Sequence, residues 1–154
     1  MKLATALTER ADLQRRLSEL ETRLNNNAKI QEGEQPAEDP ALLLTELDSI
    51  LLRLESLVAA INLTNSTTIV NGQTLTEWLA RRDCLKQRLQ IMRRFLDNAS
   101  QKIDRYSRTE IRIHSTVPVA ELQKDVDRIS KELREVDEKI QEINWTTELT
   151  QALL

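Results

Sequence analysis

Residues 119–143 read VAELQKDVDRISKELREVDEKIQEI, and the spacing of their apolar side chains decides the fold class. Apolar residues recur in alternating steps of three and four without a gap, at Val119, Leu122, Val126, Ile129, Leu133, Val136, Ile140 and Ile143. This spacing lines one face of an α-helix with an apolar stripe of the kind found in coiled coils. The stretch therefore predicts a long helix that buries one side against a second helix.

Three further stretches have the same period. The first stripe contains Leu3, Ala6, Leu13, Leu17, Leu20 and Leu24, and it stops at Asn25–Asn27, which is typical of a helix end. The second contains Leu43, Leu47, Ile50, Leu54, Leu57 and Ile61, with Leu44, Leu51 and Val58 beside it. The third runs from Leu75 to Ile103. The broad apolar face of the second stretch predicts that it is the most buried helix.

Two helix starts are marked by local signals. Asp39 is a good capping residue, and Pro40 suits the first helical position because no amide donor is missed there. Thr74 and Glu77 have the spacing of a capping box, in which each side chain accepts a hydrogen from the other residue's backbone N–H.

Composition supports an all-α fold. The chain has 154 residues, of which 40% are hydrophobic and only 3% aromatic, and it contains two Gly and three Pro, too few for the turns of a sheet protein. We expect four long amphipathic helices in an antiparallel bundle, forming one domain over residues 1–154 with short β-prone segments in the connections.

Several classes of protein are disfavoured by the same sequence. No apolar run approaches the ~20 residues of a transmembrane helix, and the opening MKLATALTER lacks the apolar core of a signal peptide, so we expect a cytoplasmic protein. One Cys and one His exclude a metal site built mainly from those residues. No glycine-rich phosphate loop or catalytic motif is present, so we expect no cofactor and no enzymatic activity.

The connections between the helices differ in character. Residues 28–38 are polar and acidic, which indicates a solvated loop. Residues 64–73 contain a β-prone core, Thr67–Val70, followed by Asn71-Gly72, which readily adopts a tight turn. In residues 104–117, Ile111, Ile113 and Ser115 alternate with polar residues, which predicts a short strand.

That predicted strand suggests how the protein assembles. An isolated strand is marginal in water, so Ile111, Ile113 and Ser115 are expected to pair with a second copy in a dimer or a higher even-numbered oligomer. The alternative is that the segment folds back over its own helices. A non-enzymatic scaffold that forms a homo-oligomer or binds a partner protein is the leading functional hypothesis.

Positive charge is concentrated in one region. Between Arg81 and Arg112 there are ten Lys or Arg against four acidic residues, whereas the rest of the chain has twelve against twenty-one. This region suggests a nucleic-acid-binding module, in which cations contact phosphates and Tyr106 stacks on a base. The candidate residues are Arg81, Arg82, Arg88, Arg93, Arg94, Lys102, Arg105, Tyr106 and Arg108. The alternative is that these cations are solvated or paired with acidic neighbours.

Two arginines occupy positions of the apolar stripes. Arg10 and Arg82 each need a carboxylate partner or a route to solvent, because an unpaired buried guanidinium costs several kcal/mol. A third hypothesis is therefore an anion receptor or an enzyme centred on Arg81, Arg82, Tyr106 and Arg108.

Four segments together resemble a family of small bacterial helical proteins called septicolysin-like. They are residues 1–40, LTEWLARRD (75–83), QKIDRYSRTEIRIHSTV (101–117) and IQEINWTTEL (140–149). The resemblance implies a small helical protein, and it carries over no enzymatic activity, cofactor or site to particular residues. The family name suggests a pore-forming toxin, but the sequence has no long apolar hairpin and few of the aromatic residues that anchor proteins at membrane interfaces.

Overall fold

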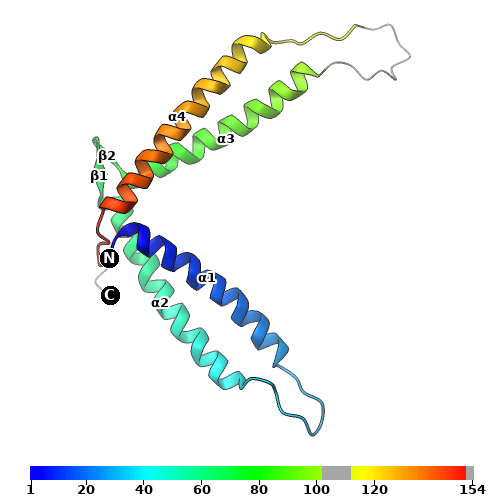
Figure 1. Ribbon diagram of the computed structural model, residues 1–154, viewed down its shortest axis with the longest axis vertical. Coiled ribbons are helices and arrows are strands. Elements are labelled where there is room, and N and C mark those ends of the chain that lie inside the picture. The colour runs from blue at the N-terminus through cyan, green and yellow to red at the C-terminus, as the bar shows by residue number, and fades with distance from the viewer. Residues whose placement is uncertain (102–111, 152–154) are drawn as a thin grey trace. The chain divides into compact units, whose positions relative to one another are not determined.

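The computed structural model describes residues 1–101 and 112–151, and in these ranges the chain is all-α (Figure 1). The helices are α1 (Leu3–Asn26), α2 (Pro40–Thr67), α3 (Leu75–Ser100) and α4 (Val119–Thr146). A small antiparallel sheet of β1 (Ile69–Val70) and β2 (Gln73–Thr74) lies in the connection between α2 and α3. The predicted fold class is confirmed.

The chain forms two compact units. Unit 1 comprises Met1–Leu75 with Gln141–Leu154, and unit 2 comprises Thr76–Ile140. None of the helices in the described ranges is both long and apolar enough to cross a membrane. A single domain over residues 1–154 stays a prediction.

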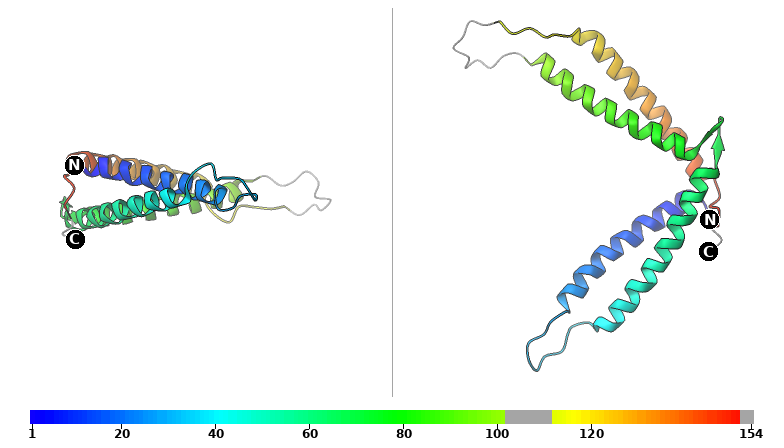
Figure 2. Two further views of the ribbon diagram at one scale, coloured as in Figure 1. Left: turned by 90° about the horizontal axis from the view of Figure 1, so that it is seen from below. Right: turned by 180° about the vertical axis from the view of Figure 1, so that it is seen from behind.

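In unit 1, α1 and α2 lie side by side and run antiparallel (Figures 1 and 2). Their facing stripes supply the core: Leu3, Ala6, Leu13 and Leu20 from α1, and Leu43, Ile50, Leu57 and Ile61 from α2. The start of α2 is as predicted, because Asp39 is its N-cap and accepts a hydrogen bond from the Ala41 N–H at 2.9 Å. The two helices bury the stripes that their sequences display.

The first and last segments of the chain meet in unit 1. The Leu3 N–H donates to the Thr147 carbonyl at 2.9 Å, and the Leu149 N–H donates to the Met1 carbonyl at 2.8 Å. Glu148 pairs with the N-terminal ammonium at 3.1 Å and with the Lys2 Nζ at 2.7 Å. Residues 147–149 are thus held beside residues 1–3 by both backbone hydrogen bonds and charge.

The prediction for residues 64–73 is partly wrong. Helix α2 continues to Thr67, so the first four residues of this connection are helical, and the strand is limited to Ile69–Val70. Thr64 is fully buried, and its hydroxyl donates to the Ala60 carbonyl at 2.8 Å and accepts from the Thr150 N–H at 2.9 Å. The predicted turn is confirmed, since Asn71 and Gly72 have φ of 53° and 77°.

The broad apolar face predicted for α2 is only partly buried. Leu42, Leu44, Leu51 and Leu52 are 69%, 51%, 44% and 69% exposed in the structure. The reason is that α2 pairs with one helix in unit 1, and one helical neighbour covers one stripe. The additional apolar residues of α2 remain uncovered by α1.

In unit 2, α3 and α4 form a second antiparallel pair. Its core contains Leu89, Leu96, Val126 and Ile129, with Leu85, Met92, Val119, Leu122 and Leu133 packed around them. Residues 112–118, which precede α4, contain no strand, so the strand predicted from Ile113 onward is wrong for the described part of that segment. Ile113 is 66% exposed, and an extended chain without a neighbouring edge gains no ladder hydrogen bonds.

Asn27 anchors the loop between α1 and α2, and we expect its removal to destabilise the protein. Its side-chain NH2 donates to the Arg23 carbonyl at 2.8 Å, and its side-chain oxygen accepts from the Glu38 N–H at 2.9 Å. Asn27 is 8% exposed, and Asn27→Ala removes the acceptor of the Glu38 N–H, whereas the Arg23 carbonyl keeps its hydrogen bond from the backbone N–H of residue 27. The expected loss is about 1–3 kcal/mol of unfolding free energy, measured by urea denaturation.

Asn25 and Asn26 are the controls for this prediction. Both are exposed residues of the same triplet. Their replacement by alanine should change the free energy of unfolding by less than about 0.5 kcal/mol. Equal losses at all three positions would contradict the assigned role of Asn27.

Candidate functional site

One long edge of the α1–α2 pair is closed by ion pairs. Glu9 contacts Arg53 at 2.6 Å, Arg16 contacts Glu46 at 3.7 Å, and Arg23 contacts Glu46 at 3.5 Å. These residues flank the apolar stripes, where charged side chains of two paired helices commonly meet. We call this side the charged edge.

On the other long edge of the same pair, the α2 side is apolar and partly exposed, while α1 contributes Leu7 followed by the polar Gln14 and Glu21. Leu44, Leu51 and Val58 of α2 follow one another at seven-residue intervals along it, and Leu7 of α1 has the corresponding position beside its own stripe. Leu44 and Leu51 are about half exposed. We call these four residues the leucine edge. A helix with an apolar flank beside its main stripe has the pattern of a bundle helix with more than one neighbour.

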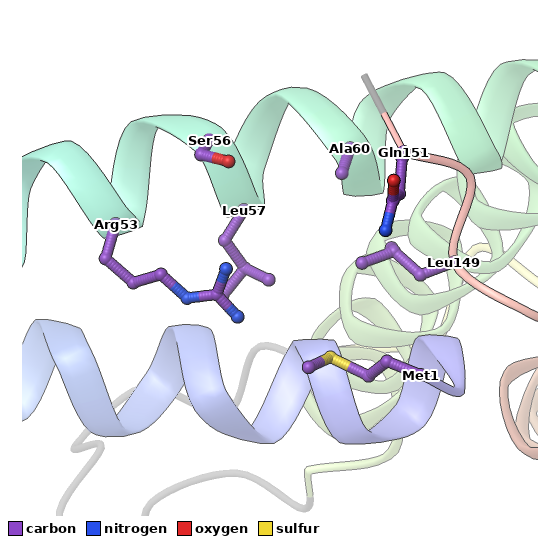
Figure 3. Close-up of a pocket in the computed structure, with 7 residues that line it drawn as sticks. All are labelled: Met1, Arg53, Ser56, Leu57, Ala60, Leu149 and Gln151. Atoms are coloured by element: carbon purple, nitrogen blue, oxygen red, sulfur yellow. The ribbon is translucent and has the colours of Figure 1, made fainter. Parts of the chain in front are cut away.

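A cavity of about 280 Å³ lies between the middle of α2 and the two ends of the chain (Figure 3). Leu57, Ala60, Leu149 and Met1 give it an apolar wall, while Arg53, Ser56 and Gln151 contribute polar groups. The volume is at the lower limit for small-molecule sites, which usually span ~300–1,000 Å³.

The cation of this cavity is already neutralised. Arg53 donates from Nε and a terminal nitrogen to the two carboxylate oxygens of Glu9, at 2.6 and 2.9 Å. These hydrogen bonds lower the pKa of Glu9 and raise the pKa of Arg53. Because the Arg53 guanidinium is hydrogen-bonded to the Glu9 carboxylate, the ion pair joins α1 to α2. Arg53 therefore offers no unpaired charge to a ligand in the cavity.

In unit 2, the first two predicted arginines are paired. Arg81 contacts Glu132 of α4 at 2.6 Å, and Arg82 contacts Asp83 at 3.0 Å and Asp137 at 4.0 Å. For these two residues the structure agrees with the alternative interpretation, in which the cations pair with acidic neighbours. Arg10 is half-buried and forms no ion pair with a described residue.

The next four cations along α3 are exposed and unpaired among the described residues: Lys86, Arg88, Arg93 and Arg94. All but Arg88 line a shallow cleft of about 330 Å³, together with Gln90 and Asp97. Leu89 and Leu133 form its apolar floor. We call this the basic cleft. It contains the predicted residues Arg93 and Arg94, and it adds Lys86 to them.

The Arg81–Glu132 contact and the shared core of Leu89, Leu96, Val126 and Ile129 align α3 with α4. Among the described residues, no ion pair joins Lys86, Arg93 or Arg94 to α4.

The remaining predicted site residues are not brought together. Lys102, Arg105, Tyr106, Arg108 and Ile111 lie outside the described residues. Ser115 forms a local turn, donating from its hydroxyl to the Val117 carbonyl at 3.2 Å. The predicted interface of Ile111, Ile113 and Ser115 stays a prediction. Within residues 1–101 and 112–151, no three His, Cys, Asp or Glu side chains form a group that could hold a metal ion.

Comparison with known proteins places the chain in a family. Residues 10–149 match the "Family of unknown function (DUF6847)". The chain belongs to the DUF6847 family. The septicolysin-like resemblance is therefore wrong, because the family that covers nearly the whole chain carries no such link. The four segments on which the resemblance rested are parts of a DUF6847 sequence.

One solved structure is similar to this chain in both sequence and fold. The crystal structure of a functionally unknown conserved protein from Corynebacterium diphtheriae shares 44% identity with it and has a TM-score of 0.91. The similarity covers 97% of this chain and 99% of that chain. No curated protein matches the chain.

The sequence alone predicted two of the three cations of the basic cleft, Arg93 and Arg94, but it did not predict the leucine edge. The positions of Leu44, Leu51 and Val58 beside the main stripe were visible in the sequence, but they were interpreted as burial in the protein's own core. The available signal was the seven-residue spacing of Leu44, Leu51 and Val58. It indicates that these residues form a second apolar flank of α2 and do not only widen the main stripe. The cavity at Arg53 had no signal, since residues from both ends of the chain build it.

Proposed function

We propose that this protein is a non-enzymatic helical scaffold that assembles as a homodimer through the leucine edge of unit 1. The observation that carries the proposal is the difference between the two edges of the α1–α2 pair. One edge is closed by three ion pairs, and the other presents Leu44 and Leu51, which are 51% and 44% exposed. The cytoplasmic location expected from the sequence is part of the same proposal.

The composition of the leucine edge favours a second copy as its occupant. In a two-fold dimer each surface contacts its own equivalent, so a stripe must be complementary to itself. If two α2 helices meet in opposite directions about an axis near Asp48, Leu44 of each copy packs on Leu51 of the other. The same Leu44–Leu51 contact forms on both sides of the axis, so the assembly is complete with two copies.

The charges beside the stripe favour the antiparallel direction. In the antiparallel pair that opposes Leu44 and Leu51, Glu55 of one copy faces Pro40 of the other. In a parallel pair Glu55 would face its own equivalent, and like charges in direct opposition are destabilising. Of the α2 carboxylates on this face, the antiparallel dimer therefore brings only the two Asp48 side chains near each other, at the two-fold axis.

Light scattering coupled to size exclusion tests the proposal. We expect a mass close to twice the chain's 17.8 kDa at micromolar concentration. A monomer at concentrations up to the hundred-micromolar range would contradict it.

Cross-linking tests which surface is used. In a Cys84→Ser background, which removes the native exposed thiol, Asp48→Cys should be joined between copies by a short thiol-reactive cross-linker. Ser49→Cys is the matched control, because it is the next exposed residue of α2 and lies on a different face. A dimer in which Ser49→Cys cross-links as well as Asp48→Cys would use another surface, and the leucine-edge proposal would be wrong.

A further inference from the structure

The basic cleft of α3 has the features of a binding site that differs from the leucine edge. Three cations, Lys86, Arg93 and Arg94, lie at one cleft without a carboxylate partner among the described residues. Little more than one turn before Lys86 in the same helix, Arg81 and Arg82 both have acidic partners. Three of the four cations of α3 without an ion pair to a described residue therefore line one hollow in the surface of unit 2, and the fourth, Arg88, lies outside it.

The floor of the cleft is apolar. Leu89 is 5% exposed and packs in the core of unit 2, and Leu133 of α4 lies partly buried beside the same core. A ligand held only by charge needs no such surface. A ligand with an anionic end and a flat apolar body uses both the cations and the floor.

Two further side chains line the cleft and suit the edge of a nucleobase. Gln90 and Asp97 are exposed on α3 at the same face. A glutamine amide can both donate to and accept from a base edge, and an aspartate accepts from an exocyclic amine. Asp97 also repels a phosphate, so it favours an orientation with the phosphate at Arg93 and Lys86 and the base towards Asp97.

We propose that the basic cleft binds a nucleotide unit, either free or within a single strand of nucleic acid. Lys86 and the Arg93–Arg94 pair contact phosphate, while Leu89 and Leu133 support the base. Lys86 lies seven residues before Arg93, about 10 Å along the helix axis, so the two can contact phosphates on either side of one nucleoside. The volume of about 330 Å³ is sufficient for one nucleotide unit.

Fluorescence anisotropy with a labelled 12-nucleotide single strand tests the proposal, between 50 and 200 mM salt. We expect wild-type binding to weaken steeply with salt. Arg93→Gln with Arg94→Gln should lower the slope of log K against log salt by about 1.4, which corresponds to roughly fiftyfold weaker binding at 50 mM. The control is Arg128→Gln with Lys131→Gln, which removes the same charge from exposed residues of α4 that each have an intrahelical partner.

A variant of the base contact completes the test. Gln90→Ala should weaken binding about tenfold without changing the salt slope, because it removes a base contact and no charge. Competition by a mononucleotide identifies the free nucleotide as a ligand, and competition by oligonucleotides alone identifies the strand. Tripolyphosphate that competes as well as a nucleotide would overturn the proposal, because it has no base. Equal loss of binding in the α4 control, binding only to anionic lipid vesicles, or no wild-type binding at 50 mM salt would also overturn it.

Discussion

Leu57→Ala is expected to lower the free energy of unfolding by about 2–5 kcal/mol. Leu57 is 1% exposed and belongs to the α2 stripe that packs on α1. Its truncation removes buried methyl groups and leaves a hollow beside the existing cavity, which is lined by the same side chain. The ion pairs of the charged edge hold the two helices at their present spacing, so we expect little collapse into that hollow.

Urea denaturation followed by circular dichroism measures this effect. Leu52→Ala is the matched control, since it makes the same chemical change in the same helix at a residue that is 69% exposed. We expect a change of less than about 0.5 kcal/mol there. Similar losses for the two variants would mean that the α1–α2 stripe is not the core of unit 1.

The second large effect concerns assembly. Leu44→Gln combined with Leu51→Gln should weaken the proposed dimer about a thousandfold. Each leucine is already half-buried in one chain, so covering the remainder contributes about 1 kcal/mol. Four such leucines meet in the two-fold contact, and their combined ~4 kcal/mol corresponds to about three powers of ten in Kd.

Sedimentation or light scattering across a dilution series measures the dissociation constant. Leu42→Gln is the control, because Leu42 is more exposed than either interface leucine and lies on the opposite side of α2. It should leave the dimer unchanged. A double variant that keeps the wild-type Kd, while remaining helical by circular dichroism, would exclude the leucine edge as the interface.

Much of the fold could be predicted because helical stripes and caps are local. The stripe of α4, the Asp39–Pro40 start of α2 and the Asn71-Gly72 turn each depend on residues within a few positions of one another. The end of α2 was misplaced because Thr64 is held by Thr150, and a contact between residues so distant in sequence leaves no local pattern.

The candidate site was predictable only in part for a related reason. An excess of cations in α3 is visible in the sequence, but which of them lack partners depends on the register between α3 and α4. That register brings Glu132 to Arg81, whereas Lys86 forms no ion pair with a described residue. Likewise, the width of the α2 face was visible, whereas the number of helices covering it was not.

The junction of residues 147–149 with residues 1–3 affects the order in which the protein can fold during synthesis. Unit 1 is discontinuous, because all of unit 2 is inserted between its two segments. On a ribosome, α1 and α2 can pair early, but Leu3, Lys2 and the Thr64 hydroxyl must wait for residues 147–150. Unit 1 is therefore begun before unit 2 and completed after it, and a chain that stops after unit 2 would carry an unfinished unit 1.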